Sequence, residues 1–293
     1  MTANSELAQL RARIDLQNAA NTARAQLHRW FAFYERDPKN WDNQFDLLSN
    51  DIEIIRGVGP EGGIETGKDN YRTSVEAFPV GEGHAHHIKR FQILPIGTTG
   101  QWLASTDLHY NNRSVDGDER AGALHYAMQL DYSTPALPTM RRVIVELDHL
   151  IDESFQDAYP LNRAASLVYY WLTLIESRDP DPTPLTEILA KDASFHLSDG
   201  RTLNSADAIA DWFTGLPSLV QASHHDVHSL TVHPQETGHL TLSMDLDWLG
   251  IDTDGRPVTA RTHHDWTLID GNGRFPQLQQ ATITQTQPIT TTH

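Results

Sequence analysis

The sequence contains no cysteine. This absence excludes disulfide bonds, a thiolate nucleophile and a metal centre held by cysteine. Apolar runs are also short: none approaches the length of about 18 residues that a membrane-spanning helix needs. Residues 1–16 lack the apolar stretch of a signal peptide. We therefore expect a cytoplasmic protein with no membrane partner.

Positive charge is scarce. The chain has 22 Lys and Arg against 39 Asp and Glu, which gives a net charge of −17. A surface this acidic repels phosphate backbones, so nucleic acid is excluded as a partner. The sequence also lacks a GxGxxG or P-loop motif and a Gly-x-Ser-x-Gly nucleophile elbow. We expect no cofactor.

An internal repeat organises what is present. The pairs His86-His87 and His224-His225 are separated by 224 − 86 = 138 residues. A constant shift over some 70 residues indicates a tandem duplication of a domain of roughly 130 residues. The same shift relates further residues, namely Asp69 to Asp207, Asp107 to Asp245, His125 to His263 and Pro138 to Pro276. Upstream, Arg36-Asp37-Pro38 recurs as Arg178-Asp179-Pro180.

Each copy has the same predicted order of elements. A helix with apolar residues at helical spacing ends at Arg-Asp-Pro, and a short helix, a strand and a third helix follow. Four strand-like segments then close each copy. Helices followed by a meander of strands predict an α+β fold, with helices packed on one face of a curved antiparallel sheet. The expected parts are an N-terminal helical extension over 1–19, domain 1 over 20–147, a linker over 148–162 and domain 2 over 163–293.

This order, with a His-His pair opening the long strands and the segment His264–Phe275 near the end, resembles the NTF2-like superfamily and its SnoaL-like branch. The resemblance implies two tandem cone-shaped, cystatin-like domains. Residues 36–42 are similar to the segment after the first helix of the scytalone dehydratase family. That similarity implies that Asp37 reaches into a pocket, that His86 is the catalytic histidine, and that the strand with Asp107 and His109 supplies a second one. In the second copy Asp247 stands in place of His109.

Alternation along the strands adds further candidates. Asp107 and His109 share one face of their strand, and His125 and Gln129 share the same face of the next. A histidine beside a carboxylate is a suitable general base at neutral pH. Neighbouring histidines of a strand point to opposite faces, so we expect no metal site. The candidate catalytic residues are Asp37, His86, Asp107, His109 and His125 in domain 1 and Asp179, His224, Asp245 and His263 in domain 2, with Tyr34 and Gln129 as substrate-binding residues.

Two functions fit these patterns. The first is a cofactor-free lyase or isomerase, of dehydratase, cyclase or ketosteroid-isomerase type, whose pocket lies in domain 1 and takes a small, partly apolar carbonyl or hydroxylated compound. The second is a non-catalytic ligand-binding or assembly protein, in which the two copies form an internal pseudo-dimer and the chain can also form a homodimer. Under the second reading the paired histidines are structural. Differences between the copies, such as Tyr126 against His264, favour unequal roles.

Overall fold

The computed structural model describes residues 3–37, 39–57, 63–97, 100–132, 137–177, 179, 181–236 and 238–291. The chain forms two compact units. Residues 26–162 make up the first, which we call domain 1. Residues 1–25 and 163–293 together make up the second, domain 2. Each unit contains one six-stranded sheet.

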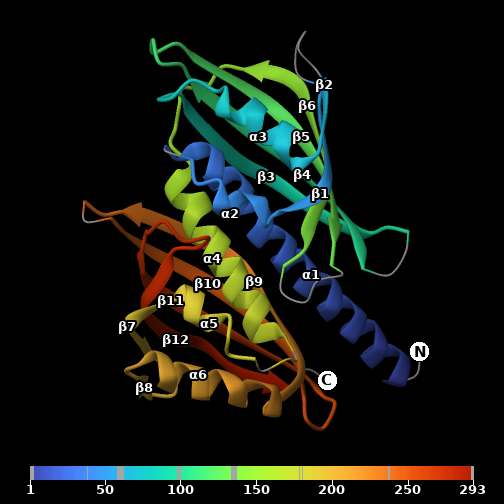
Figure 1. Cartoon of the computed structure of the whole chain (residues 1–293). Coiled ribbons are helices and arrows are strands. Elements are labelled where there is room, and N and C mark those ends of the chain that lie inside the picture. The colour runs from blue at the N-terminus through green and yellow to red at the C-terminus, as the bar shows by residue number, and fades with distance from the viewer. Residues whose placement is uncertain are drawn as a thin grey trace. The chain divides into compact units, whose positions relative to one another are not determined.

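The sheet of domain 1 has the strand order β2-β1-β6-β5-β4-β3 (Figure 1). Strands β3 to β6 pair antiparallel as a meander, whereas β1 pairs with β6 in parallel. The elements between the two long helices are α2 (Asp42–Phe45), β1 (Leu48–Arg56), β2 (Gly63–Thr66), α3 (Lys68–Glu76), β3 (Gly83–Pro95), β4 (Gln101–Arg113), β5 (Glu119–Asp131) and β6 (Thr139–Ile151).

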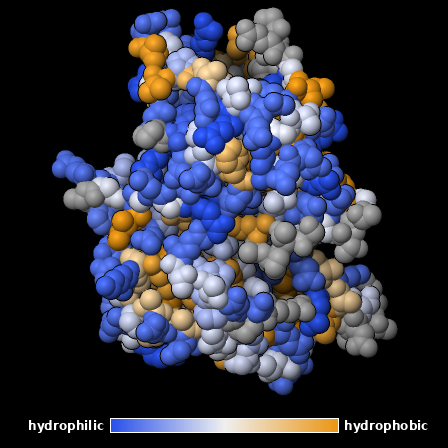
Figure 2. Space-filling view, in the orientation of Figure 1, coloured by the Kyte–Doolittle hydropathy of each residue, from blue (hydrophilic) through white to orange (hydrophobic). Residues whose placement is uncertain are grey.

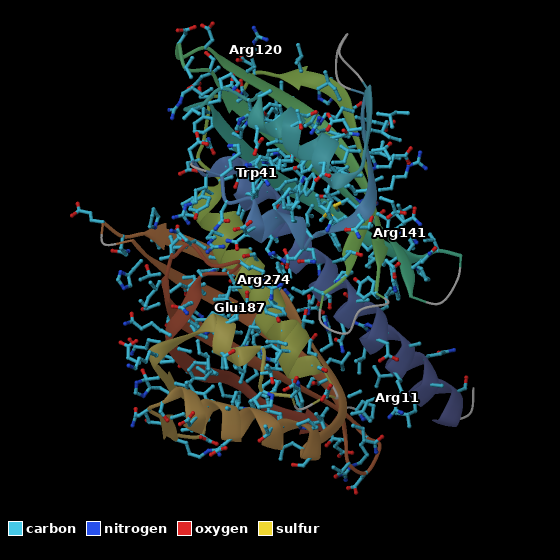
Figure 3. All side chains as sticks on the ribbon, in the orientation of Figure 1. Arg11, Trp41, Arg120, Arg141, Glu187 and Arg274 are labelled. Carbon is cyan, nitrogen blue, oxygen red and sulfur yellow. The ribbon has the colours of Figure 1, made fainter. Side chains whose placement is uncertain are left out.

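Domain 2 repeats this topology, with the strand order β8-β7-β12-β11-β10-β9 and a parallel pair between β7 and β12. A bidentate ion pair between Arg274 and Glu187 fastens α5 to the segment before the last strand (Figure 3). The elements are α5 (Leu185–Ile188), β7 (Leu189–His196), β8 (Thr202–Leu203), α6 (Ala206–Gly215), the 3-10 turn η1 (Leu216–Ser218), β9 (Val220–Pro234), β10 (His239–Asp252), β11 (Pro257–Ile269) and β12 (Gln277–Thr291).

Two long helices take part in both domains. Helix α1 (Ala3–Glu35) runs without a break because residues 3–35 contain neither glycine nor proline. Its first part belongs to domain 2 and its last ten residues to domain 1. Helix α4 (Tyr159–Glu176) carries Pro160 in its first turn, where a missing N–H costs nothing. Its first turn belongs to domain 1 and the remainder to domain 2.

Each domain has its own apolar core between helices and sheet. In β5 the residues Leu124, Tyr126 and Met128 are buried, and the alternate residues are half-buried on the opposite face. Aromatic residues of the helices fill the remaining space, as Trp30 does by stacking on Tyr71. The largest fully buried side chains are Trp30, Phe31 and Tyr71 in domain 1 and Tyr170, Phe195 and Phe275 in domain 2.

The surface is mainly hydrophilic, as expected for a chain rich in Asp and Glu. Hydrophilic residues cover most of the face seen in Figure 2. No helix among the described residues is long and apolar enough to cross a membrane.

The predicted α+β fold with two tandem domains is confirmed, and the four meander strands lie where the sequence places them. The parallel pairing of the first strand was not predicted. The predicted extension over 1–19 is the beginning of α1 rather than a separate helix. The predicted linker over 148–162 contains the end of β6 and the first turn of α4.

Candidate active site

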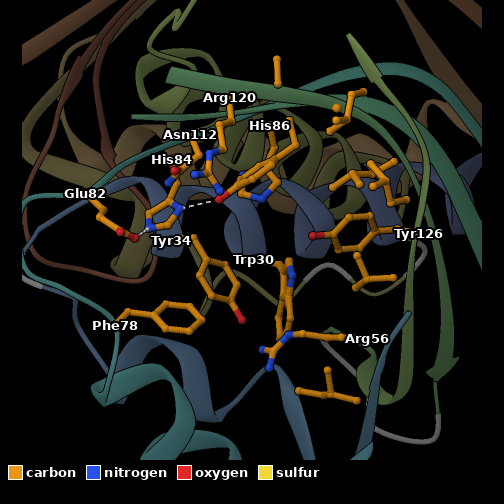
Figure 4. A pocket seen from close by; sticks show the side chains of 18 residues that line it. Trp30, Tyr34, Arg56, Phe78, Glu82, His84, His86, Asn112, Arg120 and Tyr126 are labelled. Carbon is orange, nitrogen blue, oxygen red and sulfur yellow. Dashed lines mark hydrogen bonds and ion pairs between the residues drawn. The ribbon is translucent and has the colours of Figure 1, made fainter. Parts of the chain in front are cut away.

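Domain 1 contains a cavity of about 450 Å³ on the helix-covered face of its sheet (Figure 4). Gly122 and Leu147 both line the cavity, and a Cβ on Gly122 would lie only 2.8 Å from the Leu147 side chain, so glycine lets the two strands approach there. Apolar strand residues make up much of the lining, and aromatic and titratable side chains face them. The lining residues include Trp30, Tyr34, Ile54, Arg56, Phe78, Glu82, His84, His86, Tyr110, Leu124, Tyr126, Val145, Leu147 and Leu150.

The centre of the site is a buried pair, Glu35 and His86. Glu35 is the last residue of α1, and its carboxylate Oε1 accepts from the His86 backbone N–H at 2.7 Å. The same oxygen lies 3.0 Å from the His86 Nδ1. The exposed fraction of the two side chains is 0% for Glu35 and 4% for His86. No described residue hydrogen-bonds the His86 Nε2, and the ring lines the cavity. His86 thus offers one nitrogen to the carboxylate and the other to a ligand.

Asn162, in the first turn of α4, orients this pair. Its Nδ2 donates to both Glu35 carboxylate oxygens, at 2.9 and 3.0 Å, and lies 3.0 Å from the His86 carbonyl oxygen. Its Oδ1 lies 2.7 Å from the His28 Nδ1. Phe31 stacks on the His86 ring at a centroid distance of 4.4 Å and an interplanar angle of 5°. The ring is therefore fixed both along its edge and on its face.

Burial changes the acid-base properties of the pair. It raises the pKa of the Glu35 carboxyl to about 8, although the hydrogen bonds from Asn162 and the His86 N–H lower it. Burial also lowers the pKa of His86 to about 3. Both effects disfavour charge, so the pair holds a proton near neutral pH and loses it at mildly alkaline pH. Because the two groups share a hydrogen bond, they titrate as a unit.

Three tyrosines surround the His86 ring. The centroid distances from His86 are 5.0 Å to Tyr110, 6.2 Å to Tyr34 and 6.4 Å to Tyr126. Burial raises the pKa of each phenol, so all three remain protonated and can donate hydrogen bonds at neutral pH.

Two of these phenols are already hydrogen-bonded. The Tyr34 hydroxyl contacts that of Tyr71 and also lies against Arg56, which pairs with Glu65. The Tyr110 hydroxyl lies 2.7 Å from the Nδ1 of His84. Burial lowers the pKa of His84 to about 4, so this second imidazole of the cavity is neutral.

Of the domain 1 candidates, His86 and Tyr34 line the cavity and the others lie outside it. Asp37 is exposed and accepts from the Gly81 N–H and from Lys39. His109 pairs with Glu153 at 2.8 Å. Asp107 and His125 do form the expected pair at 2.7 Å, but like Gln129 they project from the face of the sheet opposite the cavity.

The carboxylate of the site is therefore Glu35 rather than Asp37. The reason is helical geometry: Glu35 closes the last turn of α1, whereas Asp37 lies beyond the helix. The repeat contains the signal for Glu35. A shift of 141 relates Glu35 to Glu176 and Asn162 to Asn21, and each pair of identical residues falls on the two long helices.

Domain 2 contains an equivalent set of polar contacts. Glu176, the last residue of α4, accepts from the His225 N–H at 2.6 Å and lies 3.2 Å from its Nδ1. Asn21 donates to both Glu176 oxygens and lies 3.2 Å from the His225 carbonyl oxygen. The partner of His86 in the repeat is therefore His225, at 225 − 86 = 139, and not His224.

Strand pairing supports this correction. His86 lies opposite Tyr110 in domain 1, and His225 lies opposite Trp248, which is the repeat partner of Tyr110. His224 instead points to the other face of β9. There its Nδ1 lies 3.6 Å from Glu176 and its Nε2 lies 2.9 Å from Asp226.

The charge state of the domain 2 network differs from that of domain 1. Burial lowers the pKa of His224, but Asp226 and Glu176 outweigh it and raise that pKa to about 9. Burial likewise raises the pKa of Glu176, but the contacts from His224 and His225 outweigh it, so the net shift is downward. Domain 2 thus holds a fixed ion cluster where domain 1 holds a pair that titrates.

The polar cavity groups of domain 1 are also missing from domain 2 at the matching positions. The residue before Glu35 is Tyr34, whereas the residue before Glu176 is Ile175. Strand register places Trp248 at the position of Tyr110, His264 at that of Tyr126 and Leu197 at that of Arg56. Burial lowers the pKa of His264 to about 3, so it is a neutral side chain.

The remaining domain 2 candidates lie away from this network. Asp179 is exposed in a turn, where its backbone N–H donates to Ser177, and the neighbouring Arg178 and Pro180 of the motif lie outside the described residues. His263 lies 2.8 Å from Asp245, and its other nitrogen faces Ser243 and Asp265. The described residues contain no cluster of three or more His, Asp or Glu able to hold a metal ion.

No family model and no curated protein matches the chain. Solved structures do resemble it, each over about one domain. A protein from Novosphingobium aromaticivorans assigned as a scytalone dehydratase is 10% identical, covers 45% of this chain and 87% of its own, and has a TM-score of 0.41. A hexachlorocyclohexane dehydrochlorinase is 13% identical, covers 42% of this chain and 81% of its own, and has a TM-score of 0.37. An NTF2-like superfamily protein from Salmonella enterica is 14% identical, covers 43% of this chain and 85% of its own, and has a TM-score of 0.36.

At these identities the likeness concerns the fold alone. The chain itself is a tandem pair of α+β domains, each built on a six-stranded sheet with the same strand order.

Proposed function

We propose that domain 1 is a cofactor-independent lyase or isomerase that removes a proton from carbon, with His86 as the general base. One observation carries this proposal. The His86 ring is held by a buried carboxylate at Nδ1, and its Nε2 has no partner among the described residues and faces a largely apolar cavity. A base in such a position needs only a C–H bond of a bound compound within reach.

The proposed reaction begins when Nε2 takes a proton from carbon. The electron pair of the C–H bond then forms a double bond. In a lyase the neighbouring leaving group departs with its bonding pair, and in an isomerase the proton returns to a different carbon. Glu35 keeps the proton on Nδ1 and stabilises the imidazolium that forms. Base catalysis of this kind contributes on the order of 10²–10⁴ in rate.

The protonation state of the Glu35–His86 pair determines whether His86 can act as a base. Nε2 is a free base only when its proton is on Nδ1, and this requires an ionised Glu35 to accept the Nδ1–H. The raised pKa of Glu35 therefore makes the active form the alkaline one.

Domain 2 is proposed to be non-catalytic. Its Glu176 and His225 repeat the contacts of the active pair, but the cavity tyrosines and Arg56 have no counterparts there. His224 and Asp226 add opposite charges to the same network. A cluster that stays ionised near neutral pH holds its helix and strand together and has no free base to offer.

A panel of bicyclic carbon acids tests the proposal. The substrates are 2-tetralone, whose α-protons exchange with D₂O by NMR, and 2-chlorotetralin, whose loss of HCl is followed by ultraviolet absorbance. We expect turnover of at least one compound, and a loss of roughly 100-fold or more in His86→Ala.

The matched control is His125→Ala. His125 also carries a carboxylate partner, but it lies on the other face of the sheet, so this variant should keep the wild-type rate. Turnover that survives His86→Ala, or no turnover of either compound by the wild type, would exclude the proposed role of His86.

A further inference from the structure

The Tyr126 hydroxyl is a hydrogen-bond donor with no acceptor in the part of the chain that the structure describes. The residue is 7% exposed and lines the cavity from the middle of β5. No described residue hydrogen-bonds its hydroxyl, in contrast to the hydroxyls of Tyr34 and Tyr110. Figure 4 shows this hydroxyl directed into the space beside His86 and Trp30.

The ring of Tyr126 is buried, but its hydroxyl opens on the cavity. A phenylalanine would fill the same apolar space without offering a hydrogen-bond donor to a bound compound. The phenol keeps its proton because burial raises its pKa. Tyr126 is thus held ready to donate to an oxygen that the protein itself does not supply.

The position of the ring is fixed as well. Tyr126 packs edge-on against Phe31, with centroids 5.4 Å apart and an angle of 89°, and Phe31 in turn stacks on His86. His86 and Tyr126 are also nearly perpendicular, at 85°. One phenylalanine therefore positions both the proposed base and the free donor, which border the same cavity.

We propose that Tyr126 is the hydrogen-bond donor to the carbonyl oxygen of the substrate, and that the substrate is a ketone or related carbonyl compound with an acidic α-C–H and an apolar ring body. This inference rests on the proposed function of His86. It selects carbonyl compounds over carbon acids that lack an oxygen, such as alkyl halides. The apolar wall formed by Ile54, Leu124 and Val145 receives the ring body.

The step balances without a co-reactant. The His86 Nε2 takes the α-proton, the C–H electron pair forms a carbon–carbon double bond, and the carbonyl π pair moves onto the oxygen. Tyr126 donates a hydrogen bond to that oxygen as its negative charge develops. Return of a proton from His86 to carbon restores the base. A preorganised donor of this kind is worth roughly 10²–10³ in rate.

Domain 2 supports the assignment by contrast. His264 replaces Tyr126 there and is buried and neutral, and its Nδ1 has no hydrogen-bond partner among the described residues. The copy without the cavity tyrosines thus also lacks the phenol donor at this strand position.

The test is the α-proton exchange of 2-tetralone in D₂O with the full chain. Tyr126→Phe should lower the exchange rate constant by roughly 100-fold. Tyr132→Phe removes a phenol of domain 1 outside the cavity and should keep the wild-type rate. Binding gives a second readout: the wild type should bind 2-tetralone more tightly than tetralin, which lacks the oxygen, and Tyr126→Phe should reduce this preference about tenfold.

The outcomes separate the two proposals. Exchange that needs His86 but is unchanged in Tyr126→Phe would overturn the role of Tyr126 and leave the base in place. His86-dependent loss of HCl from 2-chlorotetralin, without exchange of 2-tetralone, would overturn the substrate class alone. If the wild type acts on neither compound, both proposals fail.

Discussion

Replacing Glu35 by glutamine should change how the stability of the protein depends on pH. The pKa of the buried carboxyl rises from 4.5 to about 8 on folding. A carboxyl whose folded pKa is raised contributes stability that is fully present below pH 4.5 and is lost as the pH rises through about 8. Glutamine has the same shape and no titration, so it lacks this contribution at every pH.

The magnitude follows from the shift. One pKa unit corresponds to about 1.4 kcal/mol, so the free energy of unfolding should move in favour of Glu35→Gln by that amount per pH unit between pH 4.5 and 8. The full change is roughly 4–5 kcal/mol. The difference between variant and wild type removes the titrating groups that are not coupled to Glu35. His86 is coupled to it, and its lowered pKa acts in the opposite direction, on the acid side of the window.

Urea unfolding followed by tryptophan fluorescence at several pH values measures this difference. A difference that stays constant over the whole range would refute the reasoning, because it would mean that Glu35 titrates alike in the folded and unfolded chain. A difference that moves in favour of the wild type would refute it more strongly.

Glu176→Gln in domain 2 is the matched control. The pKa of Glu176 is lowered on folding, so its contribution is present above its unfolded pKa and is lost as the pH falls. The variant should therefore lose stability relative to the wild type as the pH rises toward 4.5 and show no further change above it, which is the opposite sign in a lower pH window. If both variants change stability with the same sign, burial alone determines the direction of the pKa shift of both carboxyls.

Two further predictions concern activity. The value of kcat/KM should rise with pH and level off above about pH 8, since the active form needs an ionised Glu35; a pH–rate profile that falls over this range contradicts the assignment. Asn162→Ala should move the rising part of the pH–rate profile to higher pH, because the Asn162 hydrogen bonds lower the pKa of Glu35. Asn21→Ala removes the equivalent contact in domain 2 and should leave the profile unchanged. If Asn162→Ala lowers stability without shifting the pH–rate profile, the role of Asn162 is purely structural.

The fold was predictable because each helix and strand pattern occurs twice in the chain, so the two copies support each other. The constant shift between Asp107 and Asp245, and between His125 and His263, matches the register of paired strands in both sheets. The strands β4 and β5 and their repeats keep that shift without insertions. The parallel pairing of β1 with β6 was not predictable in the same way, because it joins residues far apart in the chain and has no local pattern.

The site was predictable only in part. The family resemblance indicates His86, and the aromatic residues at helical spacing indicate Tyr34. The same resemblance, however, indicates Asp37 beyond the helix as the carboxylate rather than Glu35 at the helix end. The repeat partner of His86 was missed for a related reason. Each copy has two adjacent histidines, so an alignment shifted by one residue still pairs histidine with histidine. Strand pairing and the contact with Glu176 identify His225 as the partner of His86.

The free donor could not be read from the sequence. Tyr126 is one of eight tyrosines, and alternation places it on the apolar side of its strand. A core tyrosine and a cavity tyrosine have the same pattern. They differ in whether the hydroxyl finds an acceptor, which depends on side chains from several elements at once.

The unbroken helix α1 has a consequence for how the protein is made. Residues 3–25 leave the ribosome before domain 1 but belong to domain 2, whose remaining residues begin at 163. Domain 1 is continuous over 26–162, so synthesis completes it while the first part of α1 still lacks its partners. A gene fragment that encodes residues 163–293 alone would omit the helix that supplies Asn18 and Asn21 to the network around Glu176. Domain 2 thus depends on a segment that is made before domain 1.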